Sequence, residues 1–163
     1  MKTIYLVRHA KSGWDSANTS DFDRPLSDRG RKSAPRMAEL LKGMGVLPEM
    51  IISSPAKRAI TTAEIFSRAL DYPEESILSL LEVYHGGTDD LLAVVRKIPA
   101  GCATAMLFGH NPTITDFAGL LAGKMMATMD PCGIARIDMD IDSWEDAGSA
   151  KGRLVWHDSP KES

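Results

Sequence analysis

The stretch Thr3-Ile4-Tyr5-Leu6-Val7-Arg8-His9 joins a short β-favouring run to an arginine and a histidine. The run is apolar and holds β-branched and aromatic side chains, which predicts a buried strand that ends at Arg8 and His9. Residues that follow a buried strand stand at an edge of the sheet, where ligands bind in many α/β proteins. These two residues are therefore the first candidates for a functional site.

Short apolar runs and helical spacings alternate along the chain beyond this strand. The runs predict further strands over residues 50–53, 76–81 and 104–108. The spacings predict helices after an N-cap at Ser27, over residues 56–70, from Asp89 or Asp90 to about residue 98, and after Pro112. Pro35 interrupts the first helical pattern and predicts a kink or a late start. The alternation predicts an α/β fold of three layers, with a mostly parallel central sheet flanked by helices.

Residues 134–157 have a different pattern. Apolar and polar residues alternate over 134–142 and a β-favouring run covers 153–157, which predicts a C-terminal β-hairpin at a sheet edge. Asp138, Asp140 and Asp142 match the start of a calcium-binding loop. The match fails at Ser143 and Ser149, because such a loop needs a glycine and a bidentate glutamate at these positions. We therefore expect a solvated strand face and no metal site.

Composition limits the class of protein. The chain has 163 residues, of which 44% are hydrophobic and 25% charged, so we expect one globular domain over 1–163 rather than a disordered chain. Its apolar runs are far shorter than a membrane span and no signal segment is visible, so the expected location is the cytoplasm. Cys102 and Cys132 show no paired spacing, which predicts reduced core residues rather than a disulfide or a zinc site.

The net charge of −3 hides an asymmetry. Residues 1–68 carry 12 Lys and Arg against 7 Asp and Glu, whereas residues 69–163 carry 7 against 15. This balance excludes a generally basic nucleic-acid binder. It leaves room for a local cationic pocket built mainly from the first half of the chain, although solvated surface charge is the simpler interpretation.

Polar groups suited to phosphate follow three of the predicted strands. The segments are Arg8-His9, Ser53-Ser54-Pro55 leading to Arg58, and Gly109-His110-Asn111-Pro112. The carboxyl ends of parallel strands share one edge of a sheet, so these segments are expected to meet in one crevice. Two arginines and two histidines around one point suit a phosphoryl group, whose oxygens match guanidinium donors. The usual nucleotide, zinc-protease and serine-hydrolase motifs are missing from the sequence.

These residues resemble the motifs of a known family. The matching segments, in order, are Arg8-His9-Ala10-Lys11-Ser12, Pro25-Leu26-Ser27 with Gly30, Ser53-Ser54-Pro55-Ala56-Lys57-Arg58-Ala59, and Gly109-His110-Asn111-Pro112. They resemble the histidine phosphatase superfamily, which has the phosphoglycerate mutase-like fold. The Arg-His-Ala-Lys-Ser form and the short chain resemble its SixA-type phosphohistidine phosphatase branch. The resemblance runs from Thr3 to about Leu121.

The resemblance implies roles for four residues. His9 would be the nucleophile that accepts the phosphoryl group and forms a phosphohistidine intermediate, which fits the chemistry of a neutral imidazole. Arg8 and Arg58 would clamp the phosphoryl oxygens, and His110 would complete the clamp as a donor that is protonated when phosphate is bound. These groups take the place of a metal ion, so no cofactor is implied.

The proton donor to the leaving group has two candidates. Many members of the superfamily place a carboxylate after the third strand, where this sequence has Glu82; the alternative is an ordinary exposed glutamate. His85 is the other candidate donor. Beside the nucleophile, Lys11 and Ser12 either contact phosphate or shape the loop.

The loop after the first strand holds two aromatic residues and an aspartate that bear on partners and substrates. Trp14 and Phe22 either contact a partner or anchor the loop by packing, and packing is expected. Asp15 stands where larger members of the superfamily often have asparagine. Their contacts to small metabolites therefore do not carry over to this chain.

The sequence thus predicts a metal-independent phosphatase with a phosphohistidine intermediate. Phosphohistidine on a protein is the expected substrate, because a short chain leaves an open crevice that admits a protein side chain. The alternatives are a phosphatase of small phosphomonoesters and a catalytically weak module that binds phosphate or phosphoproteins. Neither nucleic acid nor a membrane is expected as a partner, and the oligomeric state stays open.

Overall fold

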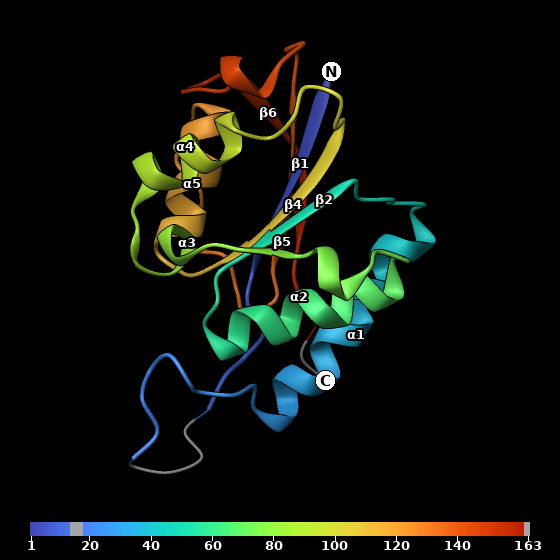
Figure 1. Ribbon diagram of the computed structural model, residues 1–163, viewed down its shortest axis with the longest axis vertical. Helices are drawn as coiled ribbons and strands as arrows, with labels where there is room; N and C mark the ends of the chain where they lie inside the picture. Colours follow the sequence, from blue (N-terminus) through green and yellow to red (C-terminus); the bar gives the residue numbers. More distant parts are fainter. Residues whose placement is uncertain (14–17, 162–163) are drawn as a thin grey trace.

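A mixed β-sheet forms the centre of the structure, a computed structural model that describes residues 1–13 and 18–161 (Figure 1). Its strands are β1 (Lys2–Arg8), β2 (Met50–Ser53), β3 (Leu78–Ser79), β4 (Thr104–Gly109), β5 (Ile134–Met139) and β6 (Gly152–Asp158). They lie side by side in the order β3-β2-β4-β1-β5-β6. β1 to β4 are parallel, whereas β5 is antiparallel to β1 and pairs with β6 as a hairpin. The predicted parallel sheet with an edge hairpin is confirmed.

Helices cover both faces of the sheet. They are α1 (Asp28–Gly43), α2 (Lys57–Ala69), α3 (Leu81–His85), α4 (Thr88–Arg96) and α5 (Thr113–Ala122), with short 3₁₀ turns η1 (Glu74–Ser76) and η2 (Trp144–Asp146). Figure 1 shows α1 and α2 on one side of the sheet and α3, α4 and α5 on the other. The predicted three layers are therefore present.

The alternating side chains of β1 explain the two layers of helices. Ile4 and Leu6 are fully buried in the core beneath α4 and α5, whereas Tyr5 and Val7 belong to the core beneath α1 and α2. Successive side chains of a strand point to opposite faces, so a run that is apolar throughout needs cover on both. This is why β1 occupies the middle of the sheet.

Strand register brings the three polar segments to one edge. Arg8 of β1 pairs with Gly109 of β4, and Ser53 of β2 pairs with Phe108. The next residues along these strands are His9, His110 and Ser54, so the three leave adjacent strands at nearly the same level. The site is thus a consequence of the parallel register.

The first helix corrects one expectation. Helix α1 begins at Asp28, directly after Ser27, whose Oγ accepts a hydrogen bond of 3.2 Å from the Gly30 N–H. The late start predicted from Pro35 is wrong. Pro35 lies inside the helix, on its exposed side, and the N-cap and the buried apolar stripe outweigh the missing N–H donor there.

The segment between β2 and β4 differs more from prediction. Only Leu78–Ser79 of the predicted strand 76–81 pairs with β2, and the residues after it form α3, which the apolar pattern did not predict. Helix α4 begins at Thr88, with Gly87 rather than Asp89 or Asp90 at the N-cap position. Short apolar runs fit a strand or a helix equally well, so periodicity cannot separate them here.

Other predictions about single residues have mixed outcomes. Cys102 and Cys132 are free and buried, as predicted. The predicted solvated face is wrong for Asp138, which has a side chain only 10% exposed; its carboxylate accepts a hydrogen bond from Thr3 and pairs with Arg136. In the described part of the chain, no helix has the length and apolar character needed to cross a membrane.

Candidate active site

His9 leaves β1 at the sheet edge and is almost completely buried, with 7% of its surface exposed. Its Nδ1 lies 2.7 Å from the carbonyl oxygen of Ala10. A carbonyl only accepts, so Nδ1 carries the proton and donates it. The lone pair therefore belongs to Nε2, which accepts a longer hydrogen bond of 3.4 Å from Nε of Arg58.

The surroundings of His9 keep its ring neutral. The pKa of His9 is lowered to about 3, chiefly by burial; the hydrogen bond to the Ala10 carbonyl opposes this shift, and the nearby His110, Arg58 and Arg8 add to it. At neutral pH the Nε2 lone pair is thus available. An imidazole in this state is a nucleophile rather than a cation.

Arg58 is held beside His9 by its place on α2. The segment Ser53-Ser54-Pro55 ends β2, and Arg58 follows in the first turn of the helix, with 5% of its surface exposed. Its Nη1 donates to the carbonyl oxygen of Asp21 at 2.6 Å, and its Nη2 pairs with the Asp21 carboxylate at 3.1 Å. All three kinds of guanidinium nitrogen are therefore engaged, which fixes the plane of the group.

His110 lies beside His9. The two rings have centroids 5.1 Å apart, and Nε2 of His110 lies 2.8 Å from Oγ of Ser54. The pKa of His110 is lowered to about 4, chiefly by burial and also by Arg58, while Asp21 opposes the shift. In the free protein this ring is therefore neutral at pH 7.

Arg8 approaches the same place from the end of β1. Its Nη1 donates to the carbonyl oxygen of Met129 at 2.8 Å, and the side-chain amide of Asn111 donates to the same oxygen at 2.9 Å. Burial lowers the pKa of Arg8, with Asp130 opposing the shift. Among the described residues, Nε of Arg8 and Nδ1 of His110 are buried without a hydrogen-bond partner. A buried unpaired donor is costly unless a ligand supplies an acceptor.

A pocket of about 460 Å³ opens over these residues, and we call it the strand-end pocket. Its lining consists of Arg8, His9, Lys11, Ser12, Asp21, Arg24, Arg58, His110, Asn111 and Pro131. Five residues predicted for the site line it: Arg8, His9, Ser12, Arg58 and His110. The three strand ends therefore meet in one cavity with predominantly basic walls.

Asp21, Arg24 and Tyr84 at this site were not among the residues predicted from the sequence. The carboxylate of Asp21 is shared among Arg58, Arg24 and Tyr84, whose hydroxyl donates to Asp21 Oδ2 at 2.8 Å. Burial raises the pKa of Asp21, but the hydrogen bonds from Tyr84 and Arg58 outweigh it and leave that pKa lowered. Asp21 is therefore an anion at neutral pH. None of these residues belongs to a sequence motif. The polar composition of the loop between β1 and α1 was the one sequence signal for Asp21.

The two candidate proton donors lie outside this cavity. Glu82 and His85 are both exposed on α3, and neither belongs to the described lining of the strand-end pocket. Their roles remain predictions. Phe22 packs edge-on against Tyr84 at a centroid distance of 5.1 Å, which fits the predicted loop anchor. Trp14 and Asp15 lie outside the described residues.

The side chains of the described residues give no set of metal ligands. Among residues 1–13 and 18–161, no three His, Cys, Asp or Glu side chains are grouped to hold a metal ion. The strand-end pocket itself offers two neutral imidazoles, those of His9 and His110, and the guanidinium groups of Arg8 and Arg58.

The chain is similar to known proteins over most of its length. The family model of the histidine phosphatase superfamily (branch 1) matches residues 4–116. The SixA protein of Agrobacterium tumefaciens is 26% identical, with a TM-score of 0.84 over 98% of this chain and 99% of that one. A protein histidine phosphatase SixA complexed with tungstate is 27% identical, with a TM-score of 0.79 over 97% of each chain.

For two further relatives, the similarity covers a smaller share of the relative's own length. An uncharacterized chloroplastic protein of Arabidopsis thaliana is 29% identical over 95% of this chain and 74% of its own length. A 2,3-bisphosphoglycerate-dependent phosphoglycerate mutase of Mycobacterium leprae is 35% identical over 61% of this chain, which covers only 42% of the mutase. The family match and the full-length likeness to SixA structures support a phosphatase, and the chain belongs to the histidine phosphatase superfamily (branch 1).

Proposed function

We propose that this protein is a metal-independent phosphatase that removes phosphate from phosphohistidine on a protein, through a phosphohistidine intermediate on His9. One observation carries the proposal most directly: the Nε2 lone pair of a neutral, buried His9 faces the guanidinium of Arg58 in the strand-end pocket. A nucleophile beside fixed cations is the arrangement that phosphoryl transfer requires.

In the first step, Nε2 of His9 attacks the phosphorus atom. A nitrogen–phosphorus bond forms to His9 while the bond to the leaving group breaks, and the leaving imidazole takes up a proton. The Nδ1–H of His9 stays on the Ala10 carbonyl, which stabilises the positive charge that develops on the ring. The backbone of Ala10 thus sets both the tautomer and the electrostatics of the nucleophile.

Charge on the phosphoryl oxygens is met by Arg8, Arg58 and His110. The unpaired Nε of Arg8 and Nδ1 of His110 gain an acceptor when an oxyanion is bound. A bound phosphate dianion also favours the charged form of His110, so we expect its pKa to rise on binding. The tungstate complex of a SixA structure is consistent with an oxyanion in such a place.

In the second step, water attacks the phosphorus atom of the intermediate. The bond to His9 breaks, inorganic phosphate leaves, and Nε2 regains its lone pair. Splitting one difficult displacement into two steps is the general advantage of a covalent intermediate. Neither step requires a metal ion.

The position of Glu82 bears on the choice of substrate. An alkoxide leaving group needs a strong proton donor, whereas the imidazole released from phosphohistidine is readily protonated near neutral pH. Because Glu82 and His85 are exposed outside the strand-end pocket, substrates with a nitrogen–phosphorus bond suit this site better than alkyl phosphates. Small phosphomonoesters are therefore the second candidate class of substrate.

The test combines turnover with detection of the intermediate. The substrates are a histidine-phosphorylated protein and p-nitrophenyl phosphate, both in the presence of EDTA. We expect turnover of the phosphoprotein, an acid-labile and base-stable adduct on His9 after rapid quench, and no turnover by His9→Ala.

His157→Ala is the matched control, because it removes an exposed histidine of β6 that does not line the strand-end pocket, and it is expected to keep full activity. An adduct on Ser12, or wild-type turnover by folded His9→Ala, would contradict the mechanism.

A further inference from the structure

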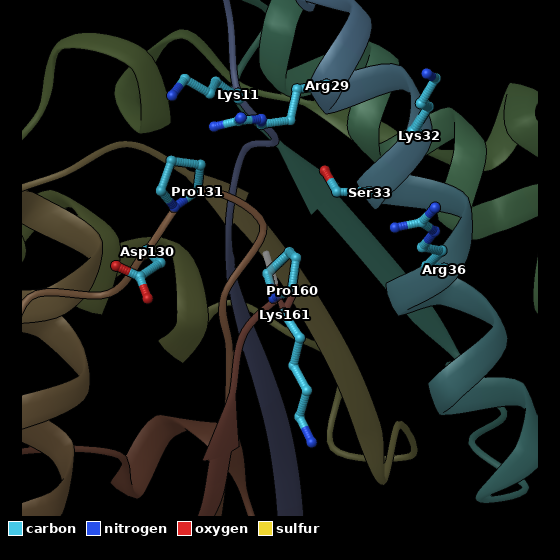
Figure 2. A pocket seen from close by; sticks show the side chains of 9 residues that line it. All are labelled: Lys11, Arg29, Lys32, Ser33, Arg36, Asp130, Pro131, Pro160 and Lys161. Atoms are coloured by element: carbon cyan, nitrogen blue, oxygen red, sulfur yellow. The ribbon is translucent and has the colours of Figure 1, made fainter. Parts of the chain in front are cut away.

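A second pocket of about 490 Å³ lies next to the strand-end pocket, and we call it the basic pocket (Figure 2). Its charged lining consists of Lys11, Arg29, Lys32, Arg36, Lys161 and Asp130. Lys11 and Pro131 line both pockets, so the two are adjacent. A group bound in the basic pocket therefore sits beside a group bound at His9.

Three separate segments supply these cations. Arg29, Lys32 and Arg36 lie on α1 with spacings of three and four residues, which puts them on one helix face. Lys11 follows β1 and Lys161 follows β6. Figure 2 shows Arg29 and Arg36 extending from α1 into the space that Pro131 and Pro160 border on the opposite side. Five cations from these segments therefore line one cavity.

The opposing charge in this cavity is small. Asp130 is the one acidic residue in the described lining, and its carboxylate accepts a hydrogen bond of 3.1 Å from Ser159. In the described part of the chain, no ion pair or hydrogen bond engages the side chains of Lys32 and Arg36. The pocket keeps a strong positive potential.

The fold gives no reason for this arrangement. Like charges three and four residues apart on a helix repel one another. Arg31 on the same helix has its partner Asp28, outside the basic pocket. The repulsion between Lys32 and Arg36 thus costs stability, and an anionic ligand would offset that cost.

We propose that the basic pocket binds an acidic segment of the phosphorylated protein substrate, beside the phosphohistidine. This inference rests on the proposed function. From Arg29 to Arg36 the row of cations is about 10 Å long, seven residues at about 1.5 Å each. Several carboxylates along a polypeptide match a row of this length, whereas one further phosphate on a small molecule would occupy only one or two cations.

The experiment uses two synthetic phosphohistidine peptides, one flanked by four glutamates and the other by four glutamines, together with p-nitrophenyl phosphate. The variant is Lys32→Glu with Arg36→Glu, neither of which lines the strand-end pocket. We expect kcat/KM for the glutamate peptide to fall about tenfold or more, and the other two substrates to stay within about twofold. Added salt should reduce the wild-type preference for the glutamate peptide.

Arg31→Glu with Lys42→Glu is the matched control, with the same change of charge on the same helix outside the basic pocket. We expect it to retain the preference, and thermal unfolding checks that both double variants are folded. Equal kcat/KM of the two peptides with the wild type, or equal loss on all three substrates in the variant, would overturn the inference alone.

Two further outcomes are separate from these. If the wild type hydrolyses p-nitrophenyl phosphate but neither peptide, the proposed substrate class fails and the inference fails with it. If the charge reversal leaves both peptides unaffected but weakens hydrolysis of a small bisphosphorylated compound, the basic pocket holds a second phosphate rather than an acidic segment, and the inference is overturned.

Discussion

The two neighbouring pockets of this protein differ in how their charged side chains are held. In the strand-end pocket, Arg58 and His9 are 5% and 7% exposed, and hydrogen bonds fix both side chains. In the basic pocket, Lys32 and Arg36 are exposed and unconstrained by described partners. Fixed, buried groups stabilise a transition state, whereas mobile, exposed cations attract and select a partner. In the proposals made above, chemistry and recognition therefore belong to two adjacent pockets.

Removing Arg58 gives the largest effect expected from this contrast. We expect Arg58→Ala to lower kcat on the order of 10² or more, because it removes a positioned donor to the transition state. Arg36→Ala is the control from the basic pocket, and its kcat for p-nitrophenyl phosphate should stay within about twofold. Steady-state kinetics measures both. A loss below tenfold in Arg58→Ala would mean that buried, fixed cations matter no more here than exposed ones.

Asp21 tests how firmly Arg58 must be held. Its carboxylate occupies the guanidinium that a phosphoryl group needs, and it is an anion in the same pocket. We expect Asp21→Asn to strengthen inhibition by inorganic phosphate about threefold to tenfold, because the competing charge is removed, and to lower kcat, because Arg58 is held less rigidly. Inhibition constants and kcat are measured together.

Asp23→Asn is the matched control for this substitution, since Asp23 is an exposed neighbour bonded only to Ser20 among the described residues. Weaker inhibition by phosphate in Asp21→Asn would show that Asp21 supports the anion site instead of competing for it.

The pH dependence of the free energy of unfolding tests the burial of the two histidines in the strand-end pocket. The pKa values of His9 and His110 are lowered to about 3 and about 4, so both rings stay neutral in the folded protein while the unfolded chain binds protons below about pH 6.5. The unfolded state thus binds more protons, and stability falls as the pH falls from about 6.5 toward 4. Urea unfolding should show a loss of at least about 1 kcal/mol per histidine at pH 5.

His110→Gln should reduce this pH dependence, and bound phosphate should reduce it too by favouring the charged ring. A pH profile that is identical in His110→Gln and in the wild type would mean that the His110 ring is protonated in the folded state.

The sequence predicted one half of the site better than the other. Arg8, His9 and His110 follow buried strands, and parallel register carries such residues to a common edge whatever the loops do. Asp21 lies in a segment without helix or strand, and it meets Tyr84 of α3, a short helix that apolar spacing did not predict. Motifs on strands and helix starts were therefore predictable, and contacts between irregular segments were not.

The lining of the basic pocket could also be predicted only in part from the sequence. The excess of Lys and Arg in residues 1–68 indicated a local cationic pocket, but the sequence did not say which cations share it. Helical spacing relates Arg29, Lys32 and Arg36 to one another, whereas Lys161 joins them only through the path of the chain after β6. The charge balance of the sequence predicts that a cationic pocket exists. The tertiary structure determines which lysines and arginines line it.

Glu82 is where the smallest effect is expected. The sequence makes it a candidate proton donor, with an ordinary exposed glutamate as the alternative, and it is exposed on α3 and does not line the strand-end pocket among the described residues. A donor must come within hydrogen-bond reach of the leaving group, and donation typically contributes about 10² to 10⁴ in rate. We therefore expect Glu82→Gln to change turnover of a phosphohistidine protein and of p-nitrophenyl phosphate by less than about twofold, because neither leaving group needs a strong acid.

An alkyl phosphate makes the comparison decisive, because its alkoxide needs a proton as the bond breaks. A loss on the alkyl phosphate alone would establish Glu82 as the acid and bring α3 into the chemistry. Equal losses on all three substrates would indicate a structural role. An unchanged rate on all three, which the exposed position of Glu82 favours, would leave water or the substrate's own imidazole as the source of the proton and would confine the catalytic groups to the strand-end pocket.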